Sequence, residues 1–159
     1  MLSMRPDPEI RVKKIAIPAG RRRTPALVLS PNEAPVLATG VLWIHGGGYI
    51  LGMKEMVHMS RAVDLVKKFG AVVVSPGYRL ALAAPYPAAL DDCYAALLYM
   101  KSHAAGLGIR VDQIVGGGEP FYAETVRYIE NLKKCGIPAS VDVYHSDMHA
   151  FDMMQPDTP

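Results

Sequence analysis

Two short, continuously apolar segments constrain the fold of this chain more than any other feature. Residues 40–45 and 71–75 are rich in Val and Ile and lack the polar alternation of a half-exposed strand. Such runs are typical of strands that are buried on both faces of a parallel sheet. Residues 53–69 between them have helical spacing and end at Gly70, with an expected apolar stripe of Met56, Met59, Val63 and Val66. A strand, a helix and a strand in this order predict a βαβ unit.

The remaining segments extend this unit into a three-layer α/β fold. Residues 10–17 and 25–30 predict an antiparallel hairpin at one edge of the sheet, because a polar turn at 20–23 joins them. Further strands are expected at 111–115 and 140–144, and further helices at 88–104, with Leu90, Tyr94, Leu97 and Leu98, and at 121–135. The predicted strand order is 1-2-4-3-5-6, in a mostly parallel sheet that belongs to a single domain, residues 1–159.

Composition narrows the class of protein. Half of the 159 residues are hydrophobic and the net charge is +2, so no basic surface for nucleic acid or an anionic membrane is expected. The run Arg21–Arg23 fits a solvated hairpin turn. No segment has the apolar length of a membrane span, and the first residues lack a secretory apolar region. Cys93 and Cys135 fall in predicted helices, which favours free thiols and a cytoplasmic location.

A glycine run directly after the strand at 40–45 is the strongest chemical signal. Glycines that leave a buried strand can direct backbone N–H groups at an oxyanion, so Gly46, Gly47 and Gly48 are the candidate oxyanion hole. The run can also be a connection that binds no ligand. A dinucleotide site is excluded, because Leu51 stands where its third glycine is required.

Four ordered segments are similar to the hormone-sensitive-lipase family of α/β-hydrolase esterases: 45–49, 78–93, Glu119-Pro120-Phe121 and His149-Ala150-Phe151. The resemblance implies an α/β-hydrolase fold and hydrolysis of small carboxylic esters without a cofactor. It implies that His149 is the general base and that Glu119 is the acid that orients it. Glu119 can also act as a charge that stabilises the N-terminus of the following helix.

The serine of this family has no counterpart in the chain. No Gly-x-Ser-x-Gly elbow occurs, and the expected position reads Gly116-Gly117-Gly118-Glu119-Pro120. By resemblance, residues 10–116 match the N-terminal part of the family fold and 117–159 the C-terminal part, with an internal block absent. Ser75, Ser146 and Cys93 are not expected to replace the nucleophile, because none follows a strand in a sharp turn.

Three interpretations remain open. A longer polypeptide that retains the internal block is an active esterase, whereas a genuine 159-residue chain is inactive alone and serves as a ligand-binding remnant or as a self-association module. His145 and His149 lie in a predicted loop without a third ligand, so no metal site is expected. Arg79 and Asp91 are expected to tie a loop to a helix. A homodimer through the exposed edge of strand 140–144 is a further expectation.

Overall fold

The computed structural model describes residues 7–33, 37–118, 129–131 and 133–134. Contacts within the chain separate a first unit, residues 1–118, from a second unit, residues 119–159. In the second unit, the described residues are helical and fall within the helix predicted at 121–135. The predicted strand 140–144 lies outside the described residues, so its pairing with 111–115, the homodimer through it and the single-domain arrangement stay predictions.

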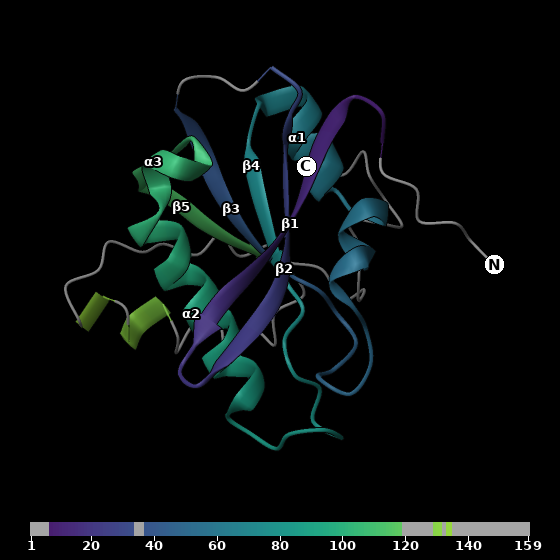
Figure 1. The fold of residues 1–159 in the computed structure, drawn as a ribbon, viewed down its shortest axis with the longest axis vertical. Helices are drawn as coiled ribbons and strands as arrows, with labels where there is room; N and C mark the ends of the chain where they lie inside the picture. The colour runs from purple at the N-terminus through teal and green to yellow at the C-terminus, as the bar shows by residue number, and fades with distance from the viewer. Residues whose placement is uncertain (1–6, 34–36, 119–128, 132, 135–159) are drawn as a thin grey trace. The chain divides into compact units, whose positions relative to one another are not determined.

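The first unit contains a five-stranded sheet in the order β1-β2-β4-β3-β5 (Figure 1). Its strands are β1 (Ile10–Ala19), β2 (Arg22–Pro31), β3 (Ala38–Ile44), β4 (Val72–Pro76) and β5 (Ile109–Gly118). The β1–β2 hairpin is antiparallel, and β2 also pairs antiparallel with β4. Strand β3 pairs in parallel with β4 and with β5. The predicted order of the first five strands and the edge hairpin are therefore confirmed.

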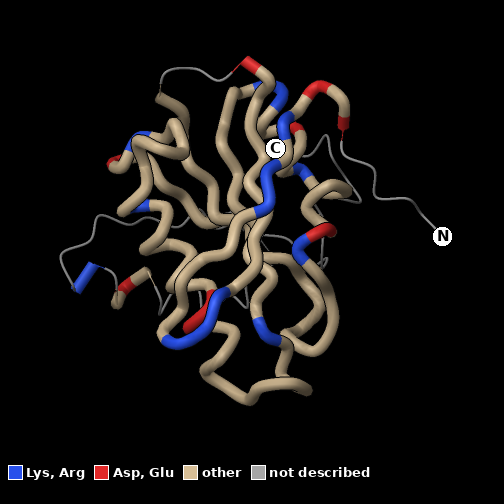
Figure 2. Tube along the Cα trace, in the orientation of Figure 1, with Lys and Arg blue, Asp and Glu red and all other residues tan. Residues whose placement is uncertain are grey.

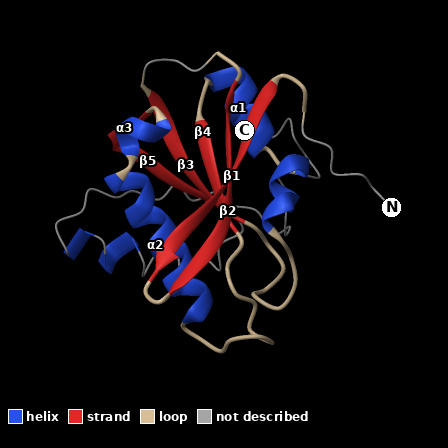
Figure 3. Ribbon diagram, viewed as in Figure 1, coloured by secondary structure: helices blue, strands red, loops and turns tan. Residues whose placement is uncertain are grey.

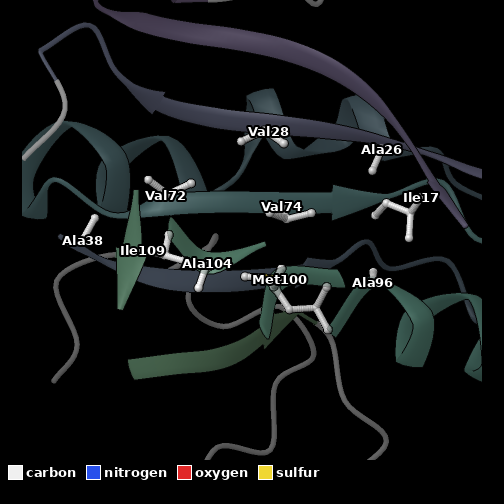
Figure 4. Packing of buried hydrophobic residues seen from close by; sticks show 11 residues of the cluster. Ile17, Ala26, Val28, Ala38, Val72, Val74, Ala96, Met100, Ala104 and Ile109 are labelled. Atoms are coloured by element: carbon white, nitrogen blue, oxygen red, sulfur yellow. The ribbon is translucent and has the colours of Figure 1, made fainter. Parts of the chain in front are cut away.

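Helices cover both faces of this sheet (Figure 3). Side chains of α2 (Ala88–Ser102) and α3 (Ala104–Leu107) form one core with Val72 and Val74 of β4 (Figure 4). On the other face, the 3-10 helix η1 (Lys54–Met59) and α1 (Ala62–Phe69) pack against Val73. Successive valines of β4 thus enter opposite cores, which confirms a strand buried on both faces and a three-layer α/β fold.

The helix predicted at 53–69 is interrupted, and its predicted stripe is partly wrong. The Ser60 hydroxyl donates to the carbonyl of Val57 at 2.8 Å and accepts the N–H of Ala62 at 3.2 Å. These local bonds compete with helical backbone bonds and separate η1 from α1. A 3-10 helix has three residues per turn, which changes the phase of the buried face. Val57, Ala62 and Val66 are buried, whereas Met56 and Met59 are exposed.

Three of the four apolar residues expected in α2 face outward, whereas the fourth, Leu97, is half-buried against the core. Leu90, Tyr94 and Leu98 are exposed, and the buried face consists of Ala88, Asp92, Cys93, Ala96 and Met100. Met100 lies over Gly40 of β3, where an added Cβ would be 3.2 Å from the Met100 Cε. Small residues on both elements therefore allow close packing of helix and sheet. Within the described part of the chain, no helix is long and apolar enough to cross a bilayer.

Arg21 lies in the turn between β1 and β2, and Arg22 and Arg23 are the first residues of β2 (Figure 2). All three are exposed, as predicted, but the turn is shorter than predicted, because β2 begins at Arg22 and not at residue 25.

Candidate active site

The glycine loop begins at the carboxyl end of β3. The last residue of that strand, Ile44, pairs with Gly118 of β5, so the two parallel strands end at the same edge of the sheet. Ligands in parallel α/β sheets bind outside the carboxyl ends of the strands. The loop that follows Ile44 therefore lies where the fold offers a binding site.

Left-handed backbone conformations shape this loop. Gly47, Gly48 and Gly52 have φ angles of 116°, 61° and 109°, and Tyr49 has a φ of 63°. A Cβ at position 47 would collide with the carbonyl group of Leu51. Glycine is therefore required at position 47, and the conformation of Tyr49 is strained, as is common in ligand-binding loops.

The carbonyl groups of the loop accept hydrogen bonds from the protein. The Tyr78 hydroxyl donates to the carbonyl of His45 at 2.8 Å. The Nδ1 atom of His45 is 2.9 Å from the carbonyl oxygen of Gly46. The N–H groups of Ile50 and Leu51 donate to Gly47 at 3.1 and 3.0 Å.

The backbone N–H groups of the three glycines differ from the carbonyl groups of the loop in their hydrogen bonding. Among the residues that the structure describes, those of Gly46, Gly47 and Gly48 donate to no other residue. N–H groups that are held in place and left without an internal acceptor can bind an anionic oxygen.

His45 is a buried part of this loop. Its ring stacks on the Tyr78 ring at 4.1 Å between centroids and an interplanar angle of 10°. Burial lowers the pKa of His45 below its usual value, although the Gly46 carbonyl and the charge of Glu55 favour the protonated form. The ring is therefore neutral at neutral pH, and the carbonyl acceptor requires the proton on Nδ1.

The structure corrects the predicted tie between a loop and a helix. Arg79 pairs with Asp92 and not with Asp91, because Asp92 belongs to the buried face of α2 while Asp91 is exposed. Burial raises the pKa of Asp92, but the hydrogen bonds and charge of Arg79 outweigh burial, and the net pKa is lowered. The ion pair fixes the segment after β4 against α2.

Two of the rejected nucleophiles, Ser75 and Cys93, are buried. Ser75 is fully buried and its hydroxyl donates to the carbonyl of Lys54 at 3.1 Å. Burial, with the charge of Asp92, raises the pKa of the Cys93 thiol to about 12. Neither group is an activated nucleophile.

Several predicted site residues lie outside the described residues. They are Glu119, Cys135, His145, Ser146 and His149. Their predicted roles are therefore untested, as is the oxyanion role of the glycines. Sequence reasoning gave no role to His45 or to Tyr78. The available signal was that both residues belong to family-like segments, 45–49 and 78–93, but this does not identify the contact between them.

Comparison with known proteins agrees with this architecture. A family model described as the alpha/beta hydrolase fold matches residues 41–119. The chain is 36% identical to the esterase LipI of Mycobacterium tuberculosis over 70% of its length, and 33% identical to hormone-sensitive lipase of Bos taurus over 61%. A solved structure of a bacterial heroin esterase superposes with a TM-score of 0.72 and 27% identity over 86% of the chain.

The matches cover only part of each relative. The chain spans 35% of LipI, 13% of hormone-sensitive lipase and 43% of the heroin esterase. The family match nevertheless includes the glycine loop and the strands on both sides of it. The chain therefore belongs to the α/β-hydrolase family that includes hormone-sensitive lipase.

Proposed function

We propose that this chain carries the oxyanion site of a carboxylic ester hydrolase and that its 159 residues do not hydrolyse esters alone. The observation that carries the proposal is the glycine loop, where the N–H groups of Gly46, Gly47 and Gly48 have no acceptor among the described residues. Such donors stabilise the negative oxygen that forms when a nucleophile attacks an ester carbonyl.

The missing function is nucleophilic attack. In α/β hydrolases the serine stands in a sharp turn directly after a strand. Here β5 ends beside β3 at Gly118, and the next residue in the sequence is Glu119. In this proposal Glu119 and His149 keep the acid and base roles of the family, but there is no serine hydroxyl for His149 to deprotonate. Loss of the serine lowers turnover by about a millionfold.

The surroundings of the loop fit a small apolar ester. Tyr49, Ile50 and Leu51 are exposed directly after the glycines. The N–H of Ala81 donates to the carbonyl of Tyr49 at 2.7 Å, which joins the segment that carries the exposed Leu82 to the loop. Exposed apolar side chains beside polar donors favour an apolar acyl or alkyl group.

Self-association is the second candidate function. Strand β5 is the outermost strand beside β3 in the described sheet, and Val111 and Val115 on it are 56% and 50% exposed. A strand at the edge of a sheet can pair with another chain. If the chain forms an oligomer and its glycine loop binds no ligand, self-association is favoured over ligand binding.

The proposal is tested with the 159-residue chain, whose mass is 17.3 kDa. We expect no hydrolysis of p-nitrophenyl acetate above the rate without protein and no covalent label from a fluorophosphonate. Monoanionic butyl methylphosphonate, which resembles the tetrahedral intermediate, should shift the amide proton resonances of Gly46–Gly48 but not that of Gly106. Stoichiometric labelling, or unshifted loop amides, contradicts the proposal.

The intact mass of the protein from its natural source tests the remaining interpretation. A larger mass, with peptides that map between the matched N-terminal and C-terminal parts, would restore the internal block and, with it, the active esterase.

A further inference from the structure

We propose that Tyr78 is a positioning residue of the glycine loop and that its hydroxyl sets the direction of the Gly46 N–H. The inference rests on the proposed function only in that this N–H contacts the oxyanion. The hydroxyl donates to the carbonyl oxygen of His45 at 2.8 Å. That carbonyl and the Gly46 N–H belong to the same peptide group.

Peptide geometry links the two atoms. A trans peptide is planar, and its C=O and N–H bonds point in opposite directions. A hydrogen bond that fixes the His45 carbonyl therefore fixes the Gly46 N–H on the opposite side of the plane. Tyr78 thus orients a donor that its own side chain does not contact.

The same arrangement continues along the loop. Nδ1 of His45 is hydrogen-bonded to the carbonyl oxygen of Gly46. The peptide group of this carbonyl carries the Gly47 N–H. The N–H groups of Ile50 and Leu51 donate hydrogen bonds to the carbonyl oxygen of Gly47. The peptide group of this carbonyl carries the Gly48 N–H. Three consecutive peptide planes are therefore held by their carbonyl oxygens. Glycine has more backbone freedom than any other residue, so these bonds are needed to keep the donors in one direction.

The tyrosine ring is held firmly enough to act in this way. Tyr78 is 5% exposed and follows β4, which is the parallel neighbour of β3. Its ring stacks on His45 and makes an edge contact with Tyr49 at 5.9 Å and 61°. One side chain therefore contacts the residues on both sides of the three glycines.

The hydrogen bond also changes the strength of the donor. A hydrogen bond to a carbonyl oxygen polarises the peptide group, which makes its N–H a stronger donor. The amide nitrogen of Gly46 should report this polarisation directly, since it belongs to the polarised group.

The test compares the Tyr78→Phe variant with the wild-type chain. Phenylalanine keeps the buried ring and removes only the hydroxyl. We expect an upfield shift of the Gly46 amide ¹⁵N resonance and an approximately fivefold rise in the Kd for butyl methylphosphonate, the size of one lost hydrogen bond (about 1 kcal/mol). The matched control is Tyr86→Phe, because Tyr86 is 86% exposed, and it should change neither quantity.

A second measurement tests the proposal if the Tyr78→Phe variant fails to fold. Incorporation of 3-fluorotyrosine makes the hydroxyl a stronger donor and should move the Gly46 ¹⁵N resonance downfield. An unchanged Gly46 resonance in either experiment overturns the role of Tyr78. Absence of phosphonate binding by the wild-type chain overturns the proposed function instead, and the Gly46 resonance then decides on Tyr78 alone.

Discussion

Arg79 and Asp92 form a bidentate ion pair between the segment after β4 and the buried face of α2. The Nε–Oδ2 distance is 2.8 Å and the Nη2–Oδ1 distance is 2.9 Å. The Arg79 backbone N–H also donates to Oδ2 at 2.9 Å. The Asp92 side chain is 3% exposed and that of Arg79 is 31% exposed. Because Tyr78 directly precedes Arg79, the pair also anchors the chain beside the glycine loop.

The Asp92→Asn variant should be less stable than the wild-type chain. It leaves the guanidinium of Arg79 without its carboxylate, and we expect a loss of about 2 kcal/mol in the free energy of unfolding, less than for a fully buried pair because Arg79 reaches solvent. Urea denaturation measures this loss. The matched control is Asp91→Asn at the neighbouring exposed position, which should change the free energy by less than about 0.5 kcal/mol. Equal effects of the two variants would contradict the assignment.

The stability difference between wild-type chain and Asp92→Asn should depend on pH. The pKa of Asp92 is lowered from 3.8 in the folded chain, so the unfolded chain binds the proton first as the pH falls. The contribution of Asp92 is therefore present above about pH 4 and is lost as the pH falls through the folded pKa. We expect a constant difference between pH 5 and 8 that narrows in acid. A difference that widens below pH 4 would show the opposite sign.

The Gly52→Ala variant should disrupt the glycine loop. Gly52 has a φ of 109°, and an added Cβ would collide with Nδ1 of His45 and lie 2.5 Å from the Gly46 oxygen. We expect a loss of about 3 kcal/mol and shifted amide resonances of Gly46–Gly48. The control is Gly106→Ala in α3, where the added methyl group meets no atom within 4 Å. A Gly52→Ala chain as stable as this control would contradict the packing of His45 against Gly52.

Cys93 should be unreactive in the folded chain. With a pKa of about 12, only about one thiol in ten thousand is ionised at pH 8, and the side chain is buried. Iodoacetamide should modify Cys93 only after denaturation, as measured by mass spectrometry of the Cys93 peptide. Rapid modification of the native chain would mean that this face of α2 opens.

The sequence predicts the sheet better than the helix faces. Val72, Val73 and Val74 form a continuous apolar run, and this run alone predicts a strand that is buried on both faces. On α2, adjacent Asp91 and Asp92 differ by one residue in helical phase, and the sequence does not decide which one faces the sheet. In the structure Asp92 lies on the same buried face as Ala88 and Ala96, and the small Ala96 packs in the core beside the sheet.

A different physical cause limits how much of the site can be predicted from the sequence. Gly46–Gly48 are recognisable because the run itself has a rare conformational property. The contact between Tyr78 and His45 joins residues 33 positions apart, and no spacing rule connects an aromatic side chain to a distant carbonyl. Such a contact becomes visible only when β3 and β4 are paired.

The tautomer of His45 is the most direct test of the loop geometry. A free neutral histidine carries its proton mainly on Nε2, but the Gly46 carbonyl can only accept, so Nδ1 of His45 must carry the proton in this structure. Burial lowers the pKa of His45 from 6.5, which keeps the ring neutral at pH 7. We therefore expect imidazole ¹⁵N resonances of the Nδ1–H form at pH 7. As the pH falls below about 6.5, the unfolded chain binds a proton at His45 before the folded chain does, so stability should decrease. His58, whose Nδ1 has no hydrogen-bond partner among the described residues, is the internal comparison in the same spectra. An Nε2–H form of His45 would mean that the Gly46 carbonyl, and with it the Gly47 N–H, is not held as described.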